Sequence, residues 1–379
     1  MNTPAFMRDI VNLACRIESA WHRINYTSDD FYKIVWEQSE KFDFGPLGEI
    51  SAQLEIMGHP LVRALQKQNT FSDLELQIYN DGRFYIEILN WHGSHVNVHD
   101  HDFSGVQFQL RGRSLNVVYD WCPTCNFGAL SQGELQLRHA ELWEEGGRSI
   151  VRAGRLDPHC VFHLSRPTAS LLIRTVPTKR YGSQLNHFPK LAAHYYVNTT
   201  YQRKILTGLA LLATSDECAF SEALGRYLNT QSLSENLFTL VKLGSRALLP
   251  SAKAVIANYA TRSEQTRLIV ESFLRGIVIG DVQRYLSEST HSTESERLAV
   301  YACIAALANG DYGRIESACQ TALAGTRFQD GRELFIRRFE GNARTQLLRA
   351  LEKLPPAADA KAMRVPSSEI MVAGARAVA

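Results

Sequence analysis

The sequence has no excess of charge of one sign and no long apolar run. Its 379 residues include 41 basic and 39 acidic ones, so the formal net charge is only +2. No global basic field of the kind that drives non-specific nucleic-acid binding is therefore expected. The longest charge-free apolar run, residues 205–215, is far shorter than the roughly 20 residues of a membrane span. Arg8 and Asp9 interrupt the N-terminal apolar pattern, which predicts no signal peptide. We expect neither a nucleic-acid partner nor a membrane partner.

Cysteine is scarce as well. Seven cysteines, an odd number, lie mostly isolated along the chain. Free thiols fit a reducing compartment better than a disulfide framework does, so we predict a cytoplasmic protein. The composition, 45% hydrophobic and 21% charged, is that of an ordinary globular protein and excludes a disordered or fibrous chain. A chain of this length favours two domains.

Three regions differ in their residue pattern. Residues 1–70 carry apolar residues at helical spacing. From residue 74 onward, short alternating runs separated by glycines follow, and Asn80-Asp81-Gly82 is typical of a hairpin turn. Many short strands of this kind predict a small β-sandwich or barrel. Beyond Pro189 the chain is rich in Ala, Leu, Arg and Glu with helical periodicity. We therefore predict an α+β protein: a sandwich or barrel with N-terminal helices over 1–189, an all-helical domain over 190–353 and a flexible tail over 354–379.

Histidines concentrate in the strand-rich region. Seven of the twelve lie between His92 and His163. On a strand, residues two apart project to the same face, so His99 and His101 can reach one ion while Asp100 turns away. Imidazole suits borderline first-row metals, which favours a metal site over a structural reading of this motif. The third ligand must come from a later strand, and His159 and His163 are both candidates.

The region around these histidines resembles a known family. The residues that carry the resemblance are Gly82-Arg83-Phe84-Tyr85-Ile86-Glu87-Ile88-Leu89-Asn90-Trp91, Gly93-Ser94, His99-Asp100-His101, Ser104, Leu110, Gly112 and Tyr119-Asp120-Trp121, followed by Pro158-His159 and Ala169-Ser170-Leu171. In order and spacing they resemble the thiol dioxygenases of the cupin superfamily, with cysteine dioxygenase as the closest type. The resemblance covers roughly residues 75–180.

The resemblance implies a cupin domain that holds Fe(II) through His99, His101 and His159. Three neutral imidazoles leave open positions for O2 and a small-molecule substrate. His163 is the alternative third ligand, although packing or a hydrogen bond is its simpler role. A typical cupin adds a carboxylate a few residues after its paired histidines. Residues 104–107 offer none here, so a triad with one carboxylate is not expected.

The sequence departs from the family pattern near the expected iron. Gly105 stands where some members carry a cysteine crosslinked to a tyrosine, so we expect no crosslink. The strand after the third ligand has Ser170, Leu172 and Arg174 in place of the family's Ser, His and Tyr. The early arginine that grips an amino-acid carboxylate has no counterpart in 71–76 either. Simple cysteine oxidation is therefore disfavoured, while iron and oxygen chemistry stay predicted.

Arg174 offers a compensation for these losses. It alternates with Ser170 and Leu172, so all three share one strand face, which points into the barrel in the family. A guanidinium there would form a fork for a substrate carboxylate or phosphate. We take Arg174 and Ser170 as the candidate catalytic residues. The alternative is that Arg174 lies at the rim in solvent or pairs with Asp157.

Two further features have modest interpretations. Cys122 and Cys125 have CxxC spacing but no second pair nearby, so two free loop thiols are expected. The helical region contains no ligand cluster, and packing is its default role. A docking surface, a homodimer contact and a lid over the barrel stay open as alternatives. The sequence thus predicts a cytoplasmic Fe(II)- and O2-dependent oxygenase acting on a small thiol or amine. The alternative is a non-catalytic metal- or ligand-binding cupin with a helical interaction domain.

Overall fold

The computed structural model describes residues 3–67, 72–93, 97–188, 190–194, 200–288 and 293–309. These residues form two compact units. Unit 1 comprises residues up to 121, 135–188 and those from 279 onward, and unit 2 comprises 122–134 and the residues from 190 to 278. No helix within these ranges is long and apolar enough to cross a membrane. The predicted tail, 354–379, lies outside the described residues, and the predicted division at 189 and 353 stays a prediction.

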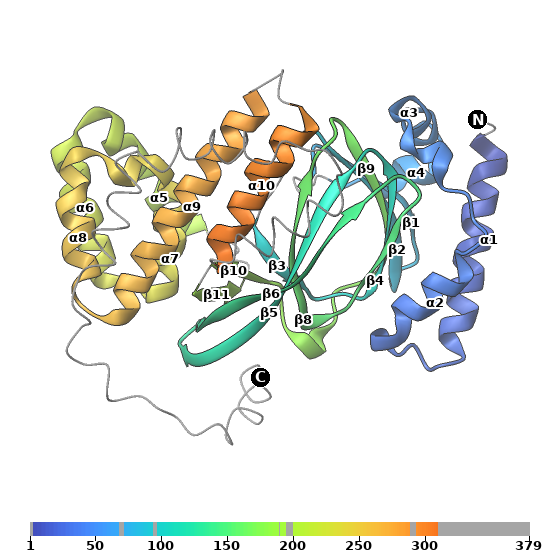
Figure 1. Cartoon of the computed structure of the whole chain (residues 1–379), viewed down its shortest axis with the longest axis horizontal. Helices are drawn as coiled ribbons and strands as arrows, with labels where there is room; N and C mark the ends of the chain where they lie inside the picture. The colour runs from blue at the N-terminus through green and yellow to red at the C-terminus, as the bar shows by residue number, and fades with distance from the viewer. Residues whose placement is uncertain are drawn as a thin grey trace. The chain divides into compact units, whose positions relative to one another are not determined.

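Four helices lie at the start of unit 1: α1 (Thr3–His22), α2 (Phe31–Gln38), α3 (Ile50–Met57) and α4 (Pro60–Leu65). The helical spacing predicted for residues 1–70 is confirmed, because Ile10, Leu13, Ile17 and Trp21 of α1 are all buried. They form one core with the apolar face of a sheet. Burial of one helix stripe against one sheet face fixes the position of that sheet (Figure 1).

That sheet has five antiparallel strands in the order β1-β2-β9-β4-β7. Their bounds are β1 (Leu74–Asn80), β2 (Phe84–Trp91), β9 (Thr168–Thr175), β4 (Gly105–Arg111) and β7 (Arg148–Val151). The hairpin predicted at residues 80–82 is confirmed, with Gly82 at a φ of 87° that favours glycine. Ile86, Val106 and Ile173 face the helices. The side chains that alternate with these along each strand point to the opposite face of the sheet, where the candidate site lies.

The second sheet closes into a six-stranded barrel in the order β10-β11-β6-β5-β8-β3. Its strands are β10 (Leu185–Phe188), β11 (Leu191–His194), β6 (Leu130–Trp143), β5 (Ser114–Phe127), β8 (Gly154–His163) and β3 (Val98–His101). Helix α10 (Glu294–Asn309) packs against it within unit 1. The ring of Tyr301 contacts that of Phe162 in a tilted arrangement, and Arg297 Nε donates to Leu164 O at 2.6 Å. The predicted α+β class, a strand-rich part followed by helices, is confirmed.

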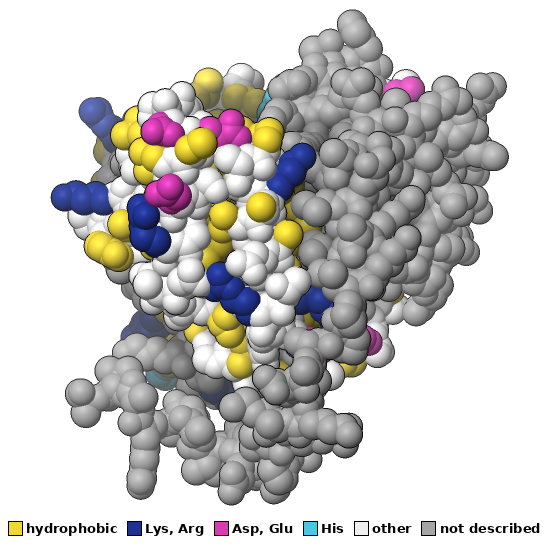
Figure 2. Space-filling model, turned by 90° about the vertical axis from the view of Figure 1, so that its left-hand side faces the viewer, with side chains coloured by type: hydrophobic (Ala, Val, Ile, Leu, Met, Phe, Trp, Pro, Cys, Tyr) yellow, Lys and Arg dark blue, Asp and Glu magenta, His cyan; other side chains and the backbone are white. Residues whose placement is uncertain are grey.

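Unit 2 is mainly helical, with α5 (Thr200–Ser215), α6 (Glu217–Thr230), α7 (Leu233–Leu243), α8 (Pro250–Ala260) and most of α9 (Glu264–Glu288). Asp216 caps α6, and Ser232 with Glu235 forms a capping box at α7. Phe220, Leu224 and other apolar residues of these helices are buried. On the face of the chain shown in Figure 2, the Lys and Arg side chains that are coloured lie scattered rather than gathered.

Candidate metal centre

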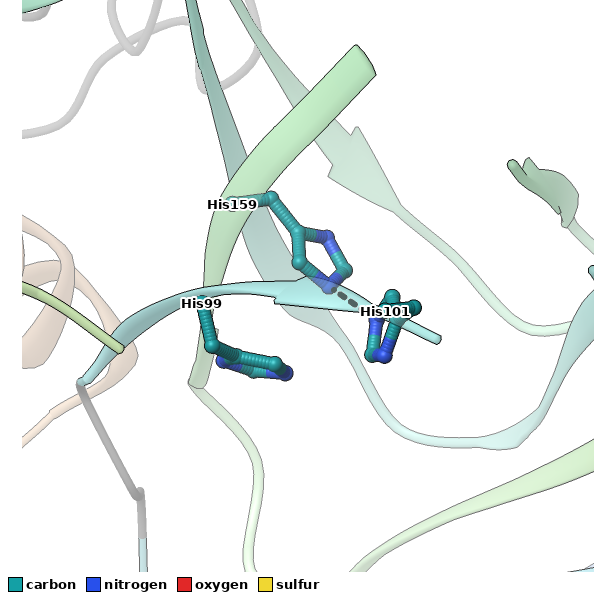
Figure 3. Close-up of side chains that lie close together, drawn as sticks. All are labelled: His99, His101 and His159. Carbon is teal, nitrogen blue, oxygen red and sulfur yellow. Dashed lines mark hydrogen bonds between the residues drawn. The ribbon is translucent and has the colours of Figure 1, made fainter. Parts of the chain in front are cut away.

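Strand β3 places two histidines on one face and an aspartate on the other. His99 and His101 point to the same side, as strand alternation predicts (Figure 3). Asp100 turns away, is buried, and accepts a hydrogen bond of 2.7 Å from the backbone N–H of Leu185. Its second carboxylate oxygen lies 3.4 Å from Nε2 of His187. Asp100 therefore anchors the strand and is not a ligand of the same ion.

His159 reaches the same point from β8. Strands β3 and β8 pair antiparallel with His99 opposite His159. One ligand nitrogen from each of His99, His101 and His159 lies within 4.8 Å of the others. The rings are evenly spaced, with centroids 4.8, 5.1 and 5.0 Å apart. In the described part of the chain, this is the only group of three such side chains that could hold a metal ion.

The spacing of two ligand nitrogens fits a metal directly. Nε2 of His101 and Nε2 of His159 are 2.9 Å apart (Figure 3). With metal–nitrogen bonds of about 2.0–2.1 Å, two imidazoles at a right angle place their nitrogens about 2.9 Å apart. The pair therefore has the separation of adjacent ligands on one ion.

Hydrogen bonds orient two of the three imidazoles. Nδ1 of His99 lies 2.9 Å from the carbonyl oxygen of Asn97, which can only accept a hydrogen bond. Nδ1 of His159 lies 2.9 Å from Oδ1 of Asn116. The amide of Asn116 is itself oriented, because its Nδ2 donates to the carboxylate of Glu141 at 3.1 Å. In both histidines the proton is thus on Nδ1, and Nε2 keeps its lone pair for a metal.

Burial keeps the three imidazoles neutral. It lowers the pKa of His99, and it lowers the pKa of His101 well below the ordinary value, with the neighbouring imidazoles as a further cause. Burial and the neighbouring His99 lower the pKa of His159 to about 3. Neutral imidazole is the form that binds a metal, so all three are ready to ligate at neutral pH.

The other candidate histidines have different surroundings. His163 stacks on Trp91 at 4.8 Å, and its Nδ1 lies 3.0 Å from the hydroxyl of Ser114. It is outside the group of three, as its simpler role predicted. His92 is exposed, and His95 lies outside the described residues.

Arg174 lies on the predicted face of β9 but has an unpredicted partner. Leu171 and Ile173 face the helices, whereas Leu172 packs with Phe103 on the other face. Ser170, also predicted for that face, is buried. Nε of Arg174 lies 2.5 Å from Oε1 of Glu87, and the Arg174 side chain is 18% exposed. Of the alternatives for Arg174, neither an exposed rim position nor a pair with Asp157 is found. Asp157 instead binds Arg138 and Arg152.

Sequence reasoning missed Glu87. It lies on β2 opposite Leu172 of β9 and is 3% exposed. The available signal was its place in the run Phe84–Trp91, where a carboxylate stands among apolar residues. A buried carboxylate needs a cation or several hydrogen bonds, so this position calls for a partner.

The structure gives clear outcomes for Gly105 and for three of the cysteines. A side chain cannot fit at Gly105, because a Cβ there would lie 2.2 Å from the carbonyl oxygen of Ile173. A crosslinked cysteine at that position is therefore excluded by the backbone packing. Cys160 is buried next to Tyr119, away from the histidines, as strand alternation predicts. The loop expected at Cys122 and Cys125 is wrong: both are free thiols on β5.

Comparison with known proteins gives no close relative. No family profile matches the chain, and no curated protein matches it significantly. Among solved structures, hydroquinone 1,2-dioxygenase from Sphingomonas sp. TTNP3 is 9% identical with a TM-score of 0.23, covering 29% of this chain and 70% of that one. The DMSP lyase DddQ from Ruegeria pomeroyi DSS-3 is 13% identical with a TM-score of 0.24, covering 36% and 67%.

Oxalate decarboxylase from Lactobacillus farciminis is 15% identical with a TM-score of 0.19, covering 29% of this chain and 35% of that one. With TM-scores this low, we transfer neither fold nor activity from these proteins. The site therefore has to be judged on its own residues.

Proposed function

We propose that this chain is a metal-dependent enzyme of the three-histidine cupin type, with Fe(II) as its metal. The observation that carries the proposal is the group His99, His101 and His159, whose nitrogens converge and whose pKa values are lowered. Fe(II) bound there would supply open coordination positions for O2 and a substrate. We further propose that the reaction is an O2-dependent oxidation of a small thiol or amine.

The chain's own residues would orient the substrate. Ser170 and Arg174 lie on the inner face of β9, and Phe103 connects this face to the histidines. The ring of Phe103 is 4.5 Å from that of His101 and 4.4 Å from the guanidinium carbon of Arg174. We propose that Arg174 binds an anionic group of the substrate and that Ser170 contributes a hydroxyl contact. The Phe103 ring would exclude water beside the reacting group.

The test measures metal and oxygen separately. The full-length protein, loaded anaerobically with Fe(II), is expected to hold one iron per chain and to consume O2 with at least one member of a panel of small thiols and amines. His159→Ala should lose the iron. The exposed His139 serves as the matched control, and His139→Ala should keep the iron. Stoichiometric iron without oxygen uptake across the panel would favour the non-catalytic, metal-binding alternative. Absence of iron binding in the wild-type chain would overturn the proposal.

A further inference from the structure

A chain of hydrogen bonds links the candidate metal centre to the protein surface. Nδ1 of His159 lies 2.9 Å from Oδ1 of Asn116, and Nδ2 of Asn116 donates to Oε1 of Glu141 at 3.1 Å. The same Oε1 accepts a second hydrogen bond, of 2.8 Å, from Nε1 of Trp143. His159 and Asn116 are buried, whereas Glu141 is exposed. One of the three imidazoles is thus connected to a carboxylate that faces water.

The amide of Asn116 could face its neighbours in either of two ways. With Oδ1 toward His159, the imidazole donates from Nδ1, and its Nε2 keeps a lone pair for a metal. If the amide were turned end for end, Nδ2 would donate to the same Nδ1, and the proton of the neutral imidazole would have to lie on Nε2. An Nε2 that carries a proton cannot bind a metal. The direction of this one amide therefore decides whether His159 can be a ligand.

Two residues of β6 exclude the turned amide. The indole N–H of Trp143 can only donate a hydrogen bond, and the ionised carboxylate of Glu141 can only accept one. Turning the amide would place Oδ1 of Asn116 against Oε1 of Glu141, so that two acceptors would meet with no proton between them. The amide is buried, and a buried polar group without a partner costs about 1–3 kcal/mol. The observed direction is therefore fixed by the chemistry of the neighbours.

The exposure of Glu141 separates its role from folding. Burial does not force a partner on an exposed carboxylate, because water can solvate it. The side chain nevertheless accepts hydrogen bonds from two buried residues, Asn116 and Trp143. An exposed position also tolerates substitution, since such changes usually have small effects on stability. Variants at residue 141 can therefore change the hydrogen bond to the amide without emptying the core.

We infer that Glu141 is a positioning residue for the proposed metal. It fixes the direction of the Asn116 amide, and the amide fixes His159 in the tautomer that can bind the ion. Trp143 holds the carboxylate in place. This inference rests on the three-histidine centre of the proposed function, and it is independent of the identity of the substrate. A merely structural contact at Glu141 would leave the tautomer of His159 unchanged.

The first test reads the tautomer directly in the metal-free, full-length protein. Nitrogen NMR of ¹⁵N-labelled histidine distinguishes a proton on Nδ1 from one on Nε2, and the signal that disappears in His159→Ala assigns the ring. We expect the wild-type His159 to carry its proton on Nδ1. Glu141→Lys replaces the acceptor with a donor, which should turn the amide and move the proton to Nε2. A proton that stays on Nδ1 in Glu141→Lys would overturn the inference, as would one on Nε2 in the wild type.

The second test measures affinity for Co(II) by competition with a chelator. Glu141→Lys should bind cobalt at least about tenfold more weakly, the usual cost of losing a residue that orients a ligand. Glu141→Gln should keep the wild-type affinity, because its amide oxygen can accept from both Trp143 and Asn116. Glu134→Lys is the matched control, since Glu134 is also exposed on β6 and the change in charge is the same. Equal losses in the two lysine variants would show an effect of net charge alone and would refute the role of Glu141.

A pair of milder substitutions covers the case in which Glu141→Lys does not fold. In Glu141→Gln the indole of Trp143 still selects the amide oxygen, and in Trp143→Phe the carboxylate still only accepts. Each single variant should therefore keep its affinity for cobalt. The double variant removes both constraints, so both amides can turn, and its affinity should fall several-fold. An unchanged affinity in the folded double variant would contradict the inference. Failure of cobalt to bind the wild-type chain would instead count against the proposed function, while the tautomer of His159 would still test the role of Glu141.

Discussion

The two sheets carry buried polar groups of opposite kinds. The barrel strands β3 and β8 present three imidazoles whose pKa values are lowered by burial, so that they stay neutral. The five-stranded sheet presents Arg174, whose charge is matched by Glu87. An ionisable group that is shielded from water is thus accommodated in two ways: by loss of the charge, or by a partner of opposite charge. The neutral set suits a cation, and the paired arginine suits an anion.

The largest effect is expected on metal affinity when one of the three neutral histidines is replaced. His101→Ala removes a ligand atom, and even loss of a residue that orients a ligand typically costs roughly 10–100-fold in metal affinity. We therefore expect a loss of at least about 100-fold, measured by equilibrium dialysis with Fe(II) under nitrogen. His163→Ala is the control from the same region of the barrel and should retain the metal. If His163→Ala lost the iron and His101→Ala kept it, the assignment of ligands would be wrong.

Substitution in the Arg174–Glu87 pair should lower the stability of the fold rather than the metal content. Glu87→Ala leaves the buried guanidinium of Arg174 without its carboxylate, and breaking a buried pair costs about 3–5 kcal/mol. We expect the lower part of this range, because Arg174 keeps some exposure, with the free energy of unfolding measured in urea. Glu49→Ala, in the exposed pair Arg111–Glu49, should cost less than about 1 kcal/mol. Equal losses of stability in the two variants would contradict the contrast between the buried and the exposed pair.

A smaller effect is expected for the residue that orients a ligand. Asn116→Ala removes the acceptor for Nδ1 of His159, so the ring loses its fixed direction and tautomer. Metal affinity should fall about tenfold. Fe(II) titration of the variant checks this. An unchanged affinity would show that packing alone orients His159.

The stability of the metal-free protein should change gradually with pH. This dependence follows from the same histidines. The pKa of His159 is about 3 in the folded chain and about 6.5 when unfolded. Between these values the unfolded state binds more protons, so stability rises with pH up to about 6.5 and is lost as the pH falls below it. Thermal unfolding of the chelator-treated chain from pH 7.5 to pH 5 should show falling midpoints. Bound metal should not flatten this slope, because it keeps the folded-state imidazoles deprotonated and protons compete with the ion as the pH falls.

The sequence periodicity correctly predicted which side chains share one face of a strand. It did not predict which distant residues those side chains contact. It placed His99 and His101 on one face, and Ser170, Leu172 and Arg174 on one face, because alternation is a local property of a strand. It did not find Glu87, since the pairing of β2 with β9 joins residues 87 positions apart. It also gave no hint that α10 packs on the barrel, because that contact depends on how distant segments meet. Cys122 and Cys125 were misplaced for a related reason: β5 continues through a proline that usually ends a strand.

The most direct test of the central claim is X-ray absorption at the iron edge of the full-length protein loaded anaerobically with Fe(II). The account predicts one iron per chain with three imidazole nitrogens in its coordination sphere and no protein sulfur, since Cys160 faces away from the histidines. A spectrum with fewer than three imidazoles, or with sulfur from the protein, would contradict the three-histidine centre.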